Sequence, residues 1–239
     1  MNKNKVKKFN CCPKLTSPVI IPTRKEVLEI FDELKPIVVN NFFTVEDLVN
    51  AIGVFIGERF HIHVKHAESA QVDQNSIQFN GFYDGGLDEA GDIPIEIYMI
   101  TNPIQDVILI DNEQFDLIGR ELADTLAHEV IHMKQSRSRD FLEVGIIVDK
   151  EPESEEEENR YYLSSPDEIN AYAYNIANEL LERNSLPMVM KKLNNLRAIS
   201  MQDSMNLWAY VQTFNKDATH PVLKKLIKKV YISLINLSK

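Results

Sequence analysis

The chain has little cysteine and no long apolar run. Its two cysteines, Cys11 and Cys12, are adjacent, so they provide neither a disulfide framework nor the spaced pairs of a zinc finger. No window approaches the roughly 20 apolar residues of a spanning helix, and the basic start lacks the apolar stretch of a secretory signal. These absences predict a protein of a reducing, cytoplasmic compartment without stable membrane association.

Positive charge is also in short supply. The chain has 36 Asp and Glu residues against 26 Lys and Arg residues, which gives a net charge of -10. Because such a chain repels phosphate backbones, we expect no nucleic-acid partner. Six glutamates lie within residues 151–158, which predicts an exposed acidic loop at about 150–160.

The composition is otherwise that of an ordinary globular protein, with 44% hydrophobic and 26% charged residues. A chain of 239 residues can bury a core of its own. Residues 1–23 are basic and interrupted by prolines, which predicts a tail or an extended arm. We expect a single domain over residues 24–239.

Hydrophobic periodicity predicts helices at both ends of the chain. Residues 23–60 favour two helices, with a break at Pro36 and a restart at Thr44, where Asp47 takes the capping-box position. From Asp116 onward the chain is predicted to be helical apart from the acidic loop.

The middle of the chain favours a small sheet. Apolar residues alternate over 60–65, and strands are also expected at 76–82 and 94–100, the last two joined by a turn at 83–92. An antiparallel sheet is the simplest arrangement. The fold class is therefore predicted as α+β, with N-terminal helices, a small antiparallel-rich sheet and a helical C-terminal half.

Residues 115–135 are predicted to form one amphipathic helix with a separate polar stripe that includes two histidines. The segment from His128 to His132 matches the pattern H-E-x-x-H, which places both imidazoles one turn apart, where they can bind one metal ion. Glu129 can accept a proton from a metal-bound water and pass it to a leaving amine. Zinc would lower the pKa of that water and polarise a carbonyl.

A catalytic zinc takes three protein ligands, so one more His, Glu or Asp is needed. Glu168 is the best candidate, at the start of a helix announced by Ser165 and Pro166. Residues 165–168 also form a capping box, which would explain Glu168 without a metal. Asp167 or a histidine elsewhere are the alternatives.

The segments HEVIHMKQ and YYLSSPDEINAYA resemble the gluzincin metallopeptidases, and more specifically a group of metallopeptidases of bacteriophage genomes. The resemblance implies a zincin-like fold with an active-site helix, and a peptide or protein substrate hydrolysed by a zinc-activated water. It implies Glu129 as general base and Glu168 as third ligand. It also implies the host cytoplasm, or association with a virion, if the chain is phage-encoded.

The same resemblance implies a strand beside the metal helix to which an extended substrate adds, expected at residues 95–100. An oxyanion donor besides zinc is also needed, and Tyr172 is preferred because it lies one turn after Glu168. The other residues chemically able to donate are Tyr161, Tyr162, Tyr174 and His220.

Two other hypotheses compete with a peptidase. The chain could be a non-catalytic phage structural or assembly protein in which zinc ties two helices together, or a self-processing or inhibited enzyme whose N-terminal tail or acidic loop occupies the cleft. His61, His63 and His66 are interpreted as a solvated sheet face rather than a second metal site. The apolar residues of segment 221–237 are expected to pack on the domain. The sequence does not indicate an oligomeric state.

Overall fold

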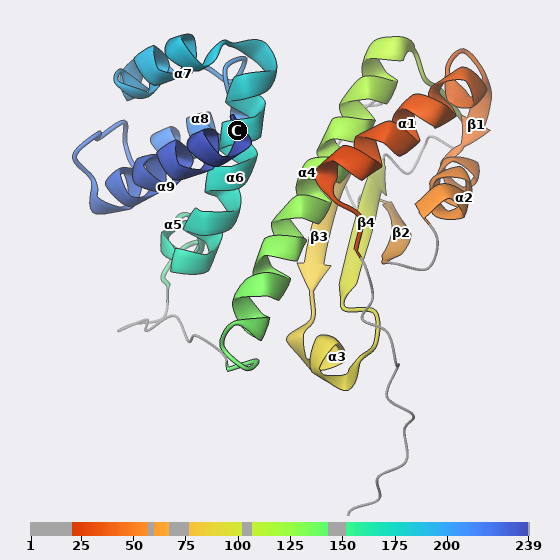
Figure 1. Cartoon of the computed structure of the whole chain (residues 1–239), viewed down its shortest axis with the longest axis horizontal. Coiled ribbons are helices and arrows are strands. Elements are labelled where there is room, and N and C mark those ends of the chain that lie inside the picture. Colours follow the sequence, from red (N-terminus) through yellow and green to blue (C-terminus); the bar gives the residue numbers. More distant parts are fainter. Residues whose placement is uncertain (1–20, 57–59, 67–76, 102–106, 143–151, 239) are drawn as a thin grey trace, which may run out of the picture.

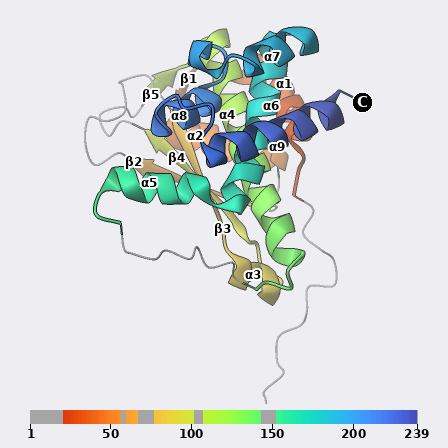
Figure 2. The ribbon, with the colours of Figure 1, turned by 90° about the vertical axis from the view of Figure 1, so that its left-hand side faces the viewer.

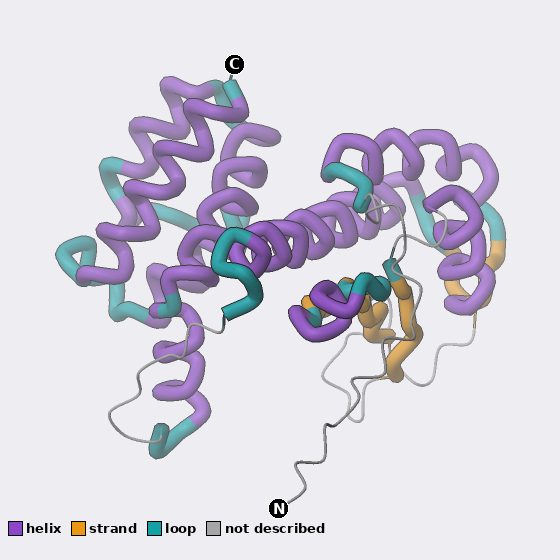
Figure 3. Tube along the Cα trace, turned by 60° about the horizontal axis from the view of Figure 1, so that its bottom comes forward, coloured by secondary structure: helices purple, strands orange, loops and turns teal. Residues whose placement is uncertain are grey.

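The computed structural model describes residues 21–56, 60–66, 77–101, 107–142 and 152–238. It has a mixed α+β fold in which helices dominate and the strands gather in one part of the molecule (Figure 3). Nearly all of the tail predicted for residues 1–23, including both cysteines, lies outside the described residues.

Helices and strands alternate in the first half of the chain, and the described part of the second half is helical. The helices are α1 (Arg24–Val38), α2 (Val45–Ile56), α3 (Gly85–Ala90), α4 (Asn112–Arg137), α5 (Glu155–Ser164), α6 (Pro166–Arg183), α7 (Leu186–Leu193), the 3-10 helix Leu196–Ala198, α8 (Met205–Thr213) and α9 (Pro221–Leu237). The strands are β1 (Phe42–Thr44), β2 (His61–His66), β3 (Gln78–Tyr83), β4 (Ile95–Thr101) and β5 (Val107–Leu109).

The larger sheet has the strand order β2-β4-β3, with β2 parallel and β3 antiparallel to β4. The three strands are found where they were predicted, but the prediction of an antiparallel sheet is wrong for β2. Alternation decides which side chains face the core, and it leaves the neighbour and direction of a strand open. Because Ile95, Ile97 and Met99 are fully buried, β4 lies in the centre of the sheet, and β3 is an edge strand.

A second sheet pairs β1 with β5 in antiparallel register. Neither strand was predicted, because three residues are too few to show a period of two.

The predicted break at Pro36 is wrong, because α1 continues through it to Val38. Pro36 has no N–H to donate to Asp32 O, but buried Leu34 and Val38 hold this last turn on the core despite the lost hydrogen bond. The restart at Thr44 is confirmed. Its Oγ1 accepts a hydrogen bond from Asp47 N at 3.0 Å, and α2 begins at the next residue.

Two segments that were predicted to be irregular contain helices. Asp84 caps α3 by accepting hydrogen bonds from two backbone N–H groups, and Gly91, with φ of 85°, ends it in the left-handed region. Within the predicted acidic loop, α5 begins at Glu155 with Ser154 as N-cap. Four glutamates fill its first turn, where the helix dipole favours negative charge.

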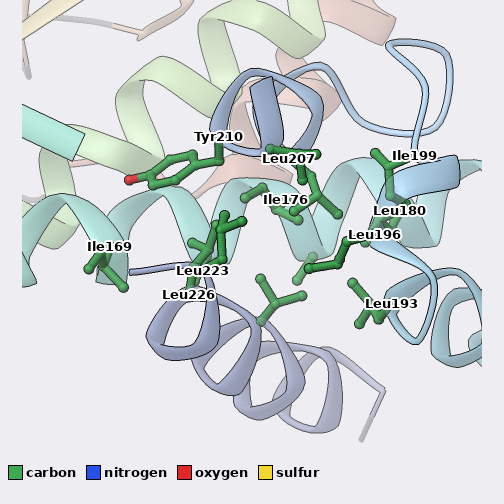
Figure 4. Packing of buried hydrophobic residues seen from close by; sticks show 14 of the residues in the cluster. Ile169, Ile176, Leu180, Leu193, Leu196, Ile199, Leu207, Tyr210, Leu223 and Leu226 are labelled. Atoms are coloured by element: carbon green, nitrogen blue, oxygen red, sulfur yellow. The ribbon is translucent and has the colours of Figure 1, made fainter. Parts of the chain in front are cut away.

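The buried apolar residues form two clusters. The N-terminal cluster joins α1, α2, β4 and α4. The C-terminal cluster joins α5 to α9, with α9 packed across α6 (Figure 2) and Tyr210 at one end of the packing (Figure 4). The two clusters meet where α4 and α6 lie side by side (Figure 1).

The amphipathic patterns predicted for the C-terminal half are confirmed. Leu223, Leu226 and Val230 of α9 are buried, and its lysines are exposed. Trp208 is partly buried against the C-terminal cluster. None of the described helices combines the length and the apolar character that a membrane crossing requires.

Gly119 allows α1 and α4 to approach closely, and its replacement tests that packing. A Cβ at this position would lie 2.7 Å from Phe31 Cδ1 and 2.9 Å from its Cγ. Since the buried ring cannot withdraw without shifting a helix, Gly119→Ala should lower the free energy of unfolding by about 1–3 kcal/mol in urea denaturation.

Gly53→Ala in α2 is the matched control, because its Cβ would meet no atom within 4 Å. Relief from the entropy cost of glycine in a helix should raise the free energy of unfolding by up to about 1 kcal/mol. Equal effects of the two substitutions would contradict the close contact between the helices.

Candidate metal centre

Three predicted side chains converge between α4 and α6. His128 Nε2 lies 3.1 Å from Glu168 Oε2, and His132 Nε2 lies 3.2 Å from Glu168 Oε1. One ligand atom from each residue lies within 4.8 Å of the other two, and the imidazole centroids are 4.7 Å apart. The structure therefore brings together His128, His132 and Glu168, which were identified from two separate segments of the sequence.

Helical spacing in α4 and the N-cap of α6 position these side chains. The four-residue interval puts both histidines on one face of α4, away from the stripe that packs in the N-terminal cluster. Ser165 caps α6 through Asp167 N, and both carboxylate oxygens of Glu168 lie beside the histidines. The capping box that would have explained Glu168 locally is therefore not formed.

A relay of polar groups orients His132. Gln135 Nε2 donates to the backbone oxygen of Asp167 at 3.2 Å, so Gln135 Oε1 is the atom that faces His132 Nδ1, at 3.0 Å. His132 Nδ1 must then carry a proton, and in the neutral ring Nε2 carries only a lone pair. Because that lone pair faces a carboxylate oxygen of Glu168, the arrangement requires a positive charge between them, either a proton or a metal ion.

Asp167, the alternative third ligand, is engaged elsewhere. Its two carboxylate oxygens accept hydrogen bonds from Arg139 Nη1 at 2.9 Å and Nη2 at 2.8 Å. This bidentate pair fixes the turn of α6 whose backbone oxygen holds Gln135. Asp167 thus supports the histidine relay rather than the ligand set.

The charges of the centre act on one another. Burial alone would raise the pKa of Glu168, but hydrogen bonds and charges from His128 and His132 lower it to about 2. Burial raises the pKa of Glu129, and the two histidines oppose that rise. Glu168 is therefore a carboxylate at neutral pH, as a metal ligand must be.

Glu129 is buried against the edge of the sheet. A Cβ on Gly81 of β3 would lie 2.6 Å from Glu129 Cγ and 2.6 Å from its Oε1, so only glycine leaves room for this carboxylate. Gly81 was not identified from the sequence. A glycine inside a predicted strand is the signal that could have indicated a close approach.

A cleft of about 800 Å³ opens beside the centre, between β3, α4 and α6. Its lining includes His128 and Glu129 at one end and residues 77–81 along one side. The strand next to the metal helix is thus β3, and the expectation that 95–100 supplies the edge is wrong, since β4 has partners on both sides. The apolar residues Ile95, Ile97 and Met99 are fully buried, as expected for a central strand.

Tyr162 and Tyr172 are the tyrosines that line the cleft. The ring of Tyr172 meets that of His128 edge to face at 4.7 Å, and it packs on buried Tyr210, a contact that was not predicted. Partial burial and the neighbouring Tyr172 and Glu168 raise the pKa of Tyr162, and burial raises that of Tyr172. Both hydroxyls therefore stay protonated and able to donate.

The remaining candidate donors are not among the residues that line this cleft. Tyr161 and His220 line a separate pocket, where Tyr161 contacts Glu157 and His220 caps α9. Tyr174 is likewise absent from the described lining.

A second group of possible ligand atoms lies on the exposed face of the sheet. His61 and His63 project from β2, and Glu96 is paired with His61 on β4; ligand atoms of the three lie within 4.8 Å of one another. Both histidines are exposed, as a solvated sheet face predicts. The side chain of His66 is outside the described part.

Asn175 is a buried amide in the lining of the cleft whose hydrogen bonds are incomplete. It is 5% exposed, and its Oδ1 has no hydrogen-bond partner among the described residues, although its Nδ2 donates to Asp124 O at 3.3 Å. An unpaired buried acceptor destabilises a folded protein. Its position in the wall of the cleft suggests a reason other than stability.

Comparisons with known proteins do not assign a family. No family model, no curated protein and no solved structure matches the chain.

Replacement of Asn175 tests whether its amide oxygen is unsatisfied. Asn175→Leu should leave the free energy of unfolding unchanged or raise it by about 1 kcal/mol in urea denaturation, because an unpaired acceptor and one long hydrogen bond are lost. Asn206→Leu is the control, because Asn206 Nδ2 donates to Glu179 Oε1 at 2.6 Å. It should lower the same quantity by about 1–3 kcal/mol. A loss of similar size in Asn175→Leu would mean that its oxygen is satisfied.

Proposed function

We propose that the chain is a zinc-dependent peptidase of the zincin-like type. The observation that supports this best is the convergence of His128, His132 and Glu168 next to the Glu129 carboxylate, at one end of an open cleft. Two imidazoles and a carboxylate form one of the ligand sets of catalytic zinc. An edge strand beside the metal helix is also what the gluzincin resemblance implies.

The spacing of the ligand atoms is compatible with a metal ion. At Zn–N and Zn–O distances near 2.05 Å, two ligands of a tetrahedral ion are separated by about 3.3 Å. The separations of 3.1 and 3.2 Å between the histidines and Glu168 are close to that value. The proton that Gln135 fixes on His132 Nδ1 leaves Nε2 as the metal-binding atom.

The residues around the centre supply the groups that peptide hydrolysis needs. When bound, zinc would polarise the scissile carbonyl and lower the pKa of an attacking water. Glu129 then accepts the proton of the water and delivers it to the nitrogen of the leaving amine. Tyr172 and Tyr162 are the candidates to donate a hydrogen bond to the oxyanion.

Metal analysis of protein purified without a metal-binding tag tests the ligand set. Wild type should contain about one zinc per chain, and His128→Ala and Glu168→Ala should lose most of it, because each removes one of three ligands. His63→Ala is the matched control, since it removes a histidine of the exposed sheet face. An equal loss in the control, or zinc retained in both site variants, would contradict this assignment.

Glu129→Gln tests the general base. The substitution keeps the shape of the side chain but removes its basicity, so hydrolysis of a peptide mixture should fall by at least about 100-fold with zinc content unchanged. Gly81→Ala should also reduce hydrolysis, because its Cβ displaces the same carboxylate, and Gly53→Ala should not. Full activity of Glu129→Gln would rule out the mechanism.

A non-catalytic role for the metal is the second candidate. The histidines belong to a helix of the N-terminal cluster and Glu168 to a helix of the C-terminal cluster, so a metal would tie the two together. That role predicts a large loss of thermal stability on chelation and no hydrolysis that depends on Glu129.

A further inference from the structure

The lining of the cleft beyond the histidines includes four residues with hydrogen-bond acceptors. Glu121 and Asp124 of α4 and Glu179 of α6 contribute carboxylates, and Asn175 contributes an amide oxygen. No lysine or arginine is among the described residues that line the cleft. We call these four residues the acceptor wall. Its composition is complementary to a group that carries positive charge and only donates hydrogen bonds.

Helical spacing arranges the acceptor wall in steps away from the metal centre. Nearest the centre, the ring of Tyr172 on α6 meets that of His128 on α4. One turn away, towards the start of α4 and the end of α6, Asn175 contacts Asp124. Glu121 lies about one more turn from Asp124. At 1.5 Å per residue, Glu121 is roughly 10 Å from His128 along α4. The wall therefore extends from the reacting centre along the length of the cleft.

Two members of the acceptor wall have no donor. Asn175 Oδ1 is buried and unpaired, and no hydrogen bond or ion pair of Glu121 occurs within the described residues. Burial, together with the charge of Asp124, raises the pKa of Glu121 to about 7. Because such groups destabilise the fold when they are left alone, their presence at an open cleft points to a ligand that supplies donors.

The same pair of helices already holds one guanidinium group. Arg24 Nε donates to Asp124 Oδ1 at 2.6 Å, and Arg24 Nη2 pairs with Glu182. Neither Arg24 nor Glu182 lines the cleft, so this contact offsets the charge of Asp124 from outside it. Glu121 and Asn175 also line the cleft, and neither Glu121 nor Asn175 Oδ1 has such a partner among the described residues.

We propose that the acceptor wall is a subsite for a positively charged group of the substrate. Two sources share this chemistry: the side chain of a lysine or arginine, and a free N-terminal amine. The proposal rests on the peptidase function proposed above and narrows its substrate class to peptides with a cation near the cleaved bond.

The position of that cation follows from the edge strand. Gly81 of β3 lies against Glu129, and Gly85, two residues beyond the end of β3, lies against Ser136, so the chain through β3 runs beside α4 in the same direction. A peptide extended along β3 advances about 3.3 Å per residue. Glu121 is therefore about three residues from the scissile bond, and a long side chain extends the range to between about two and four residues.

Peptide capture on an inactive protein tests the subsite without requiring hydrolysis. The whole chain with Glu129→Gln, loaded with zinc, is immobilised and equilibrated with paired synthetic peptides that differ only in lysine or norleucine at one position. Each pair is made with a free and with an acetylated N-terminus. Mass spectrometry of the retained peptides gives the ratio of lysine to norleucine forms.

The lysine form should be retained about tenfold more than the norleucine form, because norleucine keeps the alkyl chain and lacks the charge. Adding Glu121→Gln or Asn175→Leu to the inactive protein should bring the ratio close to one. Glu113→Gln, on the exposed first turn of α4, is the matched control and should leave the ratio unchanged. A preference for free over acetylated peptides, lost in the same variants, would identify the N-terminal amine as the cation.

The proposed subsite would be overturned if the lysine and norleucine forms were retained equally, or not at all, both with free and with acetylated N-termini. A preference that survives both wall substitutions would overturn it as well. Hydrolysis dependent on Glu129 without a cation preference would leave the peptidase standing and remove the subsite. Cation-dependent capture without any hydrolysis would keep the subsite and remove the peptidase.

Discussion

The contact between α4 and α6 is the constraint on which every candidate functional feature depends. It brings Glu168 within 3.2 Å of two imidazoles that lie more than 30 positions earlier in the chain. It also closes one side of the cleft and aligns the acceptor wall. Because the two helices belong to different hydrophobic clusters, the centre lies where the clusters meet. Side chains held in this way by two packed bodies keep their geometry better than side chains on loops.

Polar contacts at both ends of the seam hold the helices in register. At one end Arg139 binds both oxygens of Asp167, whose backbone oxygen orients Gln135 and so His132. At the other end Arg24 bridges Asp124 of α4 and Glu182 of α6. Buried carboxylates are costly unless they are paired. The seam therefore pairs Asp124 and Asp167 with arginines, whereas Glu121, which lines the cleft, has no such partner among the described residues.

The sequence predicted most of the helices and three of the strands, but not how the strands are joined. Periodicity located α4 and its polar stripe, and the capping signal at Thr44 located the start of α2. The prediction from sequence failed at Pro36, where burial of the flanking residues outweighed the loss of one hydrogen-bond donor. It also failed at the acidic run, where the Ser154 cap and the helix dipole favour α5. In both cases a specific interaction favoured the helix, and the composition of the segment did not reveal that interaction.

The sequence by itself determined the residue types of the candidate centre: two histidines one helical turn apart, a glutamate between them, and a later acidic residue at a helix start. Only the tertiary structure decided that Glu168 rather than Asp167 completes the group, that β3 rather than β4 borders the cleft, and that Gly81 makes room for Glu129. The physical reason is the range of the interactions. Helical spacing and capping act over a few residues, whereas ligand convergence, strand order and close approach depend on the packing of distant segments.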